Sequence, residues 1–185
     1  MSDSTATADP KTRWILAGRV DEFPDGEGQA VELEEDHVVA VFQVDGEWSA
    51  IDEACPHSGA SLATGSIEQA AVTCPWHKWQ FDLKTGRRID QPGSGVRTYA
   101  VEVRGDEVWI DARGTELPPR FLVRYGAPGW VAWFSDSNQL ECRPRDRVVI
   151  ATDRGRELGE LVALPDGSGG EAAGQAIGEL LRMAT

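Results

Sequence analysis

Two short loops that contain cysteine and histidine constrain this chain more than any other feature of its sequence. The first reads C-P-H-S-G and contains Cys55 and His57, and the second reads C-P-W-H and contains Cys74 and His77, with sixteen residues between His57 and Cys74. The chain has three cysteines and three histidines, so four of these six residues fall within a window of 23. Thiolates and imidazoles gathered in this way are typical ligands of a transition metal. The fold must therefore bring the two loops together.

The spacing C-x-H, sixteen residues, C-x-x-H resembles the motif of the Rieske [2Fe-2S] family, and in particular its soluble ferredoxin-like branch. Proline follows each cysteine, Gly59 follows the first histidine by two residues, and the second loop continues as K-W-Q-F-D-L-K-T-G from Lys78 to Gly86. The resemblance covers residues 13–111, a whole domain. It implies a mainly β fold: a Rieske-type antiparallel β-sandwich with two cluster-binding loops.

The resemblance also implies the cofactor, one [2Fe-2S] cluster per chain. Cys55 and Cys74 would bind one iron, and His57 and His77 the other. Neutral imidazoles leave a cluster less negative than four thiolates would, which raises its reduction potential. Each imidazole keeps a second nitrogen that can take up a proton, so we expect the potential to depend on pH.

A tetrahedral zinc site with two cysteines and two histidines is the alternative metal centre. Zinc fingers of that composition usually place both cysteines in one knuckle and both histidines on one helix. Here each loop contains one of each, and Pro56 and Pro75 disfavour a helix. A brown protein with charge-transfer absorption would favour iron, and a colourless protein with one zinc would favour the alternative.

Two residue types expected in quinol-oxidising members of the family are missing from the loops. Those members carry a disulfide between the loops, but the corresponding residues here are Ala60 and Trp76. They also place a hydroxyl donor after the second histidine, where this chain has Lys78 and Trp79. We expect packing alone to hold the loops. With fewer hydrogen bonds to sulfur and an acidic domain, we expect a potential near the lower end of the roughly −150 to +300 mV Rieske range.

The histidine count argues against a terminal oxygenase. Oxygenase subunits with a Rieske domain add an iron held by two histidines and a carboxylate, but only His37 remains beside His57 and His77. The sequence also lacks a flavin or nicotinamide fingerprint. We expect a non-catalytic component of an oxidoreductase system that transfers single electrons between a reductase and an acceptor protein. Two alternatives stay open: a redox-sensing regulatory protein that signals through its C-terminal module, and the small subunit of a nitrite-reductase-like complex.

Charge and composition indicate the compartment and the partners. The net charge is −13, and residues 1–112 contribute −12 of it, with nine Lys and Arg against 21 Asp and Glu. This acidity disfavours nucleic-acid binding by the Rieske domain and favours a basic redox partner. No apolar run is long enough to cross a membrane, and the N-terminus lacks signal-peptide features. With two cysteines assigned to iron, only Cys142 is left to form a disulfide, so we expect a cytoplasmic protein without membrane contact.

Short β-favouring runs separated by turn pairs such as Asp45-Gly46 indicate an all-β chain. The expected strands lie at residues 14–17, 38–44, 47–52, 72–73, 101–104 and 107–110. We divide the chain into a disordered N-terminus at residues 1–12, the Rieske domain at 13–112, a linker at 113–119 and a small β-rich accessory module at 120–185.

The accessory module contains R-V-V-I, T-D-R-G and E-L-G, and so resembles the front part of a polymerase-suppressor-type domain over residues 120–185. After a glycine-rich linker, Asp166–Gly170, we expect a short helix over Glu171–Met183. Its apolar stripe would pack on its own module or on a second copy. This stripe contains Ile177, Leu180 and Leu181.

Several neighbours of the loops have two readings. Trp76 and Trp79 either shield a cluster and provide electron-transfer contact or simply pack in the core, the second being favoured for Trp79. Phe81 should share the core face of Trp79. A basic stretch beyond the second loop is either a docking patch or a solvated turn, the second being favoured; it contains Lys78, Lys84, Arg87 and Arg88. We expect His37 to be an exposed turn residue.

Overall fold

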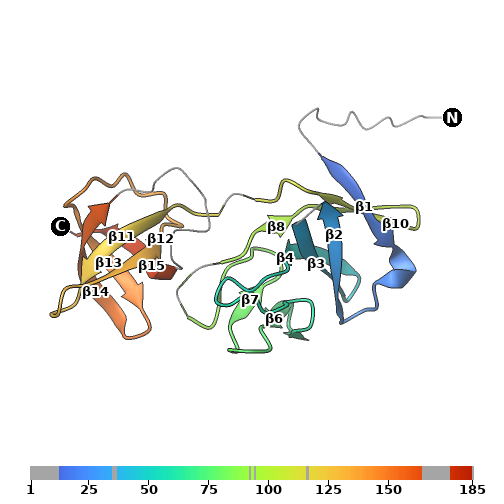
Figure 1. Ribbon diagram of the computed structural model, residues 1–185, viewed down its shortest axis with the longest axis horizontal. Helices are drawn as coiled ribbons and strands as arrows, with labels where there is room; N and C mark the ends of the chain where they lie inside the picture. The colour runs from blue at the N-terminus through green and yellow to red at the C-terminus, as the bar shows by residue number, and fades with distance from the viewer. Residues whose placement is uncertain are drawn as a thin grey trace.

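The computed structural model describes residues 13–34, 37–91, 93, 95–115, 117–163 and 176–184. Within these residues the regular structure consists of fifteen strands and one 3-10 helix, η1 (Val20–Glu22). Figure 1 shows two lobes joined by an extended segment, with β1 to β10 in one lobe and β11 to β15 in the other. The predicted mainly β class is confirmed.

The N-terminal lobe contains an antiparallel sandwich. One sheet has the order β1 (Trp14–Arg19), β10 (Glu107–Asp111), β9 (Val101–Arg104). The other has the order β2 (Gly28–Glu34), β3 (His37–Val44), β4 (Glu47–Asp52), β8 (Thr98–Tyr99). Apolar side chains from both sheets form one core, which includes Val39, Val41, Ala50, Val108 and Ile110.

A third sheet carries the second ligand loop and closes a second core. It consists of β5 (Ser66–Glu68), β6 (Ala71–Thr73) and β7 (Gln80–Asp82). Because side chains alternate across a strand, β3 contributes Val39 and Val41 to the sandwich core but Ala40 and Phe42 to this second core. Strand β3 is therefore buried on both faces between the sandwich and the metal-loop region, as its continuous apolar sequence indicates.

The predicted strand ranges agree best with the structure for strands that lie next to a tight turn. Strands β4 and β9 have the predicted bounds, and Asp45-Gly46 makes the turn between β3 and β4 with φ angles of 52° and 82°. Positive φ at both positions is the requirement of a two-residue hairpin turn. Strands β2, β5, β7 and β8 were not predicted; β5, β7 and β8 are two or three residues long and exist through pairing rather than local preference.

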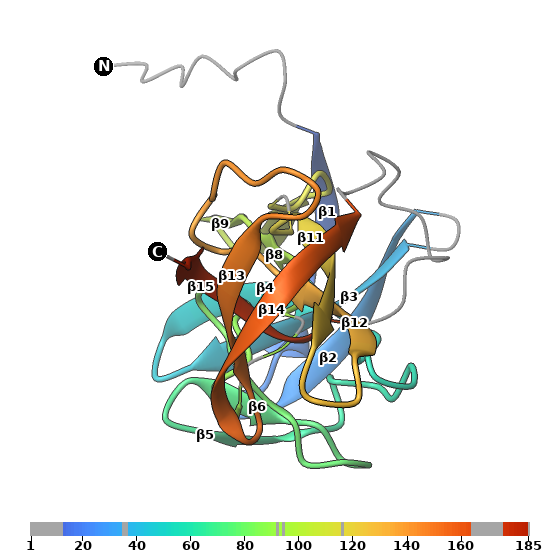
Figure 2. The same cartoon turned by 90° about the vertical axis from the view of Figure 1, so that its left-hand side faces the viewer.

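The C-terminal lobe is a closed five-stranded barrel. Its order is β11 (Arg120–Tyr125), β12 (Trp130–Ser135), β15 (Ala176–Met183), β13 (Arg147–Thr152), β14 (Gly155–Ala163). Figure 2 shows this barrel facing the reader, with β13 and β14 crossing in front. Closure leaves no open sheet edge. A separate core fills the barrel and includes Val123, Phe134, Val148, Ile150, Leu161 and Leu180.

The predicted C-terminal helix is wrong where the structure describes it. Residues 176–183 form β15, which pairs parallel with β12 and antiparallel with β13. Ala176, Gly178 and Leu180 are buried in alternation, the period of a strand, while Ile177 is 45% exposed. The barrel needs this strand between β12 and β13, and that demand overrides the local helix preference. Residues 171–175 and the predicted linker Asp166–Gly170 lie outside the described residues.

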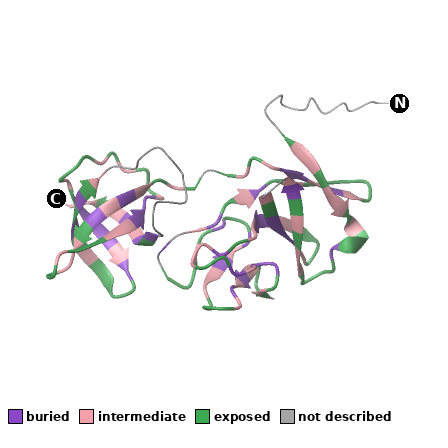
Figure 3. Ribbon diagram, viewed as in Figure 1, coloured by how far each residue is buried: buried purple, intermediate pink, exposed green. Residues whose placement is uncertain are grey.

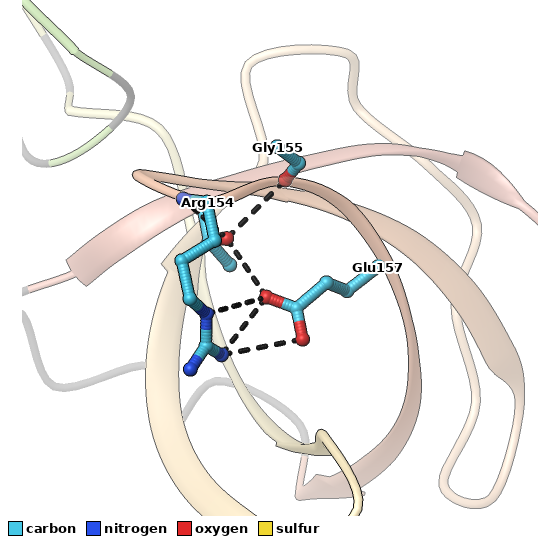
Figure 4. Close-up of polar contacts among 4 residues, drawn as sticks. Arg154, Gly155 and Glu157 are labelled. Atoms are coloured by element: carbon cyan, nitrogen blue, oxygen red, sulfur yellow. Dashed lines mark hydrogen bonds and ion pairs between the residues drawn. The ribbon is translucent and has the colours of Figure 1, made fainter.

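The T-D-R-G motif forms the turn between β13 and β14, shown in Figure 4. The Thr152 hydroxyl lies within hydrogen-bond distance of two acceptors for its one proton, the Gly155 carbonyl (3.2 Å) and the Glu157 carboxylate (2.9 Å), and Arg154 donates to Glu157. The Arg154 guanidinium lies 4.5 Å from the ring centroid of Trp130 and so ties this turn to the neighbouring hairpin. These residues therefore have a local structural role; the polymerase-suppressor resemblance itself stays a prediction.

Burial follows the two-lobe arrangement, with buried segments inside each lobe in Figure 3. The prediction that His37 is an exposed turn residue is wrong: it begins β3, and its Nε2 lies 3.1 Å from the Tyr99 hydroxyl. Tyr99 in turn donates to Asp52 (2.7 Å). Among the described residues, no helix has the length and apolar character required to cross a membrane.

Candidate metal centre

The first ligand loop follows β4 and is closed by backbone hydrogen bonds around Cys55. The Cys55 N–H donates to the carbonyl of Ala60 (2.8 Å), and the Cys55 carbonyl accepts from the N–H of Gly59 (2.8 Å). Gly59 adopts a φ of 72°, in the left-handed region that glycine enters without a steric penalty. The loop thus turns back on itself within five residues and holds Cys55 at its base.

The second ligand loop connects β6 to β7 and repeats this frame. The Cys74 N–H donates to the Trp79 carbonyl (2.7 Å), and the Cys74 carbonyl accepts from Lys78 N–H (3.1 Å). Lys78 has a φ of 61° at the position that Gly59 occupies in the first loop. A non-glycine residue is strained there. The two loops therefore present their cysteines through equivalent backbone turns.

The four predicted ligands come together as two pairs. Cys55 and Cys74 are 1% and 0% exposed, and their side chains interact with each other. The rings of His57 and His77 lie 3.8 Å apart between centroids; His57 is half-buried and His77 is exposed. The sulfur pair lies inside the lobe and the imidazole pair at its surface.

The surroundings change the acidity of both kinds of ligand. Burial is the main cause that raises the pKa of Cys55 to about 11, and the neighbouring Cys74 raises it further, while the His57 backbone N–H and the charge of Arg88 oppose this. The pKa of His57 is lowered by burial first, then by the charges of His77 and Arg88. The Ser58 hydroxyl lies 2.9 Å from His57 Nδ1 and helps to orient that ring. Thiolates at the buried position therefore need a metal to become the stable form.

The donor arrangement fits a cluster of two irons. A mononuclear zinc site would require four donors around one centre, whereas a Rieske cluster has thiolates on one iron and imidazoles on the other. The buried Cys55–Cys74 pair and the surface His57–His77 pair match the second arrangement.

The residues that replace the loop disulfide differ widely in exposure. Ala60 is 1% exposed and packs in the second core, while Trp76 is 63% exposed beside His77. The cysteines of the chain are free. The large exposed indole of Trp76 favours a contact role over core packing.

Trp79 and the basic stretch behave differently from each other. Trp79 packs against the second core together with buried Phe81, as predicted. Lys78, Lys84 and Arg87 are exposed, but the Arg88 side chain is only 3% exposed. The basic stretch is therefore neither one patch nor one solvated turn. Sequence reasoning missed the burial of Arg88; the nearby Asp90, which pairs with it, was the available signal.

Comparison with known proteins agrees with this geometry. Residues 13–100 match the Rieske family, described as the Rieske [2Fe-2S] domain. The chain is 40% identical over 87 residues to the 3-phenylpropionate/cinnamic acid dioxygenase ferredoxin subunit of Escherichia coli (strain K12), covering 46% of this chain and 82% of that protein.

Two further relatives differ in kind. The probable 3-ketosteroid-9-alpha-monooxygenase oxygenase component of Rhodococcus rhodochrous is 32% identical over 140 residues, covering 69% of this chain; the chain spans only 35% of that protein. A solved structure of an NADH-dependent nitrite reductase small subunit from Mycobacterium tuberculosis aligns with a TM-score of 0.51 and 27% identity, covering 54% of this chain and 94% of that structure.

Proposed function

The chain belongs to the Rieske [2Fe-2S] family, and from this premise we propose that Cys55 and Cys74 hold one iron of the cluster while His57 and His77 hold the other. The single observation that supports this assignment best is the separation of a buried sulfur pair from a surface imidazole pair. When bound, the cluster supplies reversible one-electron transfer. The protein is thus an electron-transfer component, and its residues bind the cluster, keep water from its sulfur end and expose its imidazole end.

We infer that single electrons pass between a reductase and an acceptor protein through the imidazole end. His77 is exposed, and Trp76, 63% exposed, lies next to it in the chain. An exposed indole beside a ligand offers a partner an apolar anchor of the kind that dominates protein interfaces. The surrounding domain carries −12, which favours a partner with a basic rim. The similar E. coli protein is a ferredoxin subunit of a dioxygenase, which supports this function.

A redox-sensing role is the second candidate, because the two lobes are in contact near the cluster loops. Arg87 donates to Glu179 on β15 (3.3 Å), and Ser137 also donates to Glu179 (3.0 Å). These residues border a cleft of about 530 Å³ between the lobes. A change in cluster charge could alter this contact and so reach the barrel. The similarity to a nitrite reductase small subunit supports membership of such a complex as a third candidate.

Stopped-flow reduction of the purified holoprotein by a flavoprotein reductase tests the carrier function. We expect rapid reduction, followed by reoxidation with the acceptor protein. The sensor would instead show partner affinity that changes with the oxidation state of the cluster, measured by pulldown under oxidising and reducing conditions. A cytoplasmic location is part of this proposal, and fractionation of the native cell tests it.

A further inference from the structure

Arg88 combines a permanent positive charge with burial beside the metal loops. Its side chain is 3% exposed, whereas the side chain of its neighbour Arg87 is 61% exposed. Burial of a guanidinium is costly unless the charge is paired and hydrogen-bonded. The chain therefore keeps one of two adjacent arginines in an environment where its charge acts much more strongly than at the surface.

One aromatic ring separates this charge from a proposed iron ligand. The Arg88 Cζ lies 3.4 Å from the ring centroid of Trp79, and the rings of Trp79 and His57 lie 5.0 Å apart between centroids. The Trp79 carbonyl also accepts the hydrogen bond of the Cys74 N–H (2.7 Å). The stack is therefore attached to both ligand loops, through a ring contact in one and a backbone bond in the other.

The partner of Arg88 leaves much of this charge uncompensated at the loops. Arg88 donates to both carboxylate oxygens of Asp90, at 2.9 and 2.8 Å. Asp90 also accepts from the Gln80 N–H (3.0 Å), and its side chain is 25% exposed. Water therefore screens the carboxylate more than the guanidinium, which also stacks on the Trp79 ring.

We propose that Arg88 raises the reduction potential of the cluster through its buried positive charge. The argument rests on the ligand assignment under the proposed function. Reduction adds one electron, and thus one negative charge, to the cluster without changing the charge of Arg88. A nearby buried cation attracts that added charge and stabilises the reduced form, whereas exposed cations of the same segment act through water. Arg88 thus opposes the effect of the acidic domain.

The test is a reductive titration with dithionite of the intact holoprotein at fixed pH under anaerobic conditions. Arg88→Met removes the charge and keeps an unbranched apolar chain against the indole. We expect the reduction equilibrium constant to fall about tenfold, which for one electron corresponds to about 59 mV. The matched control is Lys84→Met, which removes an exposed cation of the same segment and should leave the potential unchanged.

Asp90→Asn gives the opposite sign and keeps the test valid if Arg88→Met fails to fold. Removal of the counter-charge leaves Arg88 in place and should raise the potential. Arg88→Lys retains a cation and should stay closer to the wild type than Arg88→Met. A purely structural role for Arg88 would not produce shifts of opposite sign in the two charge variants.

Failure of the proposed function and failure of the inference about Arg88 give different results. Wild-type protein without iron and labile sulfide would reject the proposed function and with it this inference. An Arg88→Met protein with an intact cluster signal in electron paramagnetic resonance and a wild-type potential would overturn the inference alone. A wild-type potential in Asp90→Asn would do the same.

Discussion

The two ligand loops have the same backbone frame and different side-chain surroundings. In each loop the cysteine N–H donates to the carbonyl five residues ahead, and the residue four ahead is left-handed: Gly59 in one loop and Lys78 in the other. His57 is half-buried against Trp79, while His77 is exposed. Backbone turns therefore set where the sulfur donors lie, and packing sets how far each imidazole meets solvent or a partner.

Removal of either buried cysteine should have the largest effect on the loops. Cys55→Ala and Cys74→Ala each remove one of the two thiolates of the sulfur-bound iron, so both proteins should lose the cluster, as measured by iron and labile sulfide per chain. Cys142→Ala is the matched control, since Cys142 lies in the barrel beside Met183 and should retain a full cluster. Retention of the cluster in either loop variant would contradict the assignment of that cysteine as a ligand.

Exchange of an imidazole for a thiolate should lower the reduction potential. His77→Cys adds negative charge to the cluster, and the potential should fall by on the order of 100 mV. His57→Cys should lower the potential further than His77→Cys, because His57 is half-buried and a thiolate there is less screened by water. Spectroelectrochemical titration measures both. A wild-type potential in either variant would argue against that residue as a ligand.

Truncation of the exposed indole should slow exchange with a partner without altering the cluster. Trp76→Ala removes a side chain that is 63% exposed beside His77, and the second-order rate constant for reduction by a reductase should fall about tenfold. The potential should not move. Leu158→Ala, in the barrel at 53% exposure, is the control. Equal rates for Trp76→Ala and wild type would place the docking surface elsewhere.

Exchange of the left-handed residues should have the smallest effect, with opposite signs in the two loops. Lys78→Gly relieves strain and should stabilise the holoprotein by about 0.5–1 kcal/mol, while Gly59→Ala should cost about 1 kcal/mol. The cost of Gly59→Ala does not come from a steric clash with neighbours, because nothing lies within 4 Å of an added Cβ. Guanidinium unfolding followed by cluster absorption measures both changes. Effects of the same sign would show that the frames are not equivalent.

Sequence could predict the loops because their chemistry is local. The ligand motif, the Asp45-Gly46 turn and the strands β4 and β9 each depend on residues adjacent in the chain. The strand β15 could not be predicted, since its form depends on the gap between β12 and β13 in the closed barrel. The burial of Arg88 was also missed, because it depends on Trp79 and Asp90 rather than on its basic neighbours.

Mössbauer spectroscopy of the reduced, iron-57-labelled protein tests the central claim most directly. Sulfur donors on one side and nitrogen donors on the other require two iron environments in equal amounts, one ferric with thiolates and one ferrous with imidazoles. We expect two such components and two irons per chain. A single iron environment, or a colourless protein with one zinc, would contradict the account.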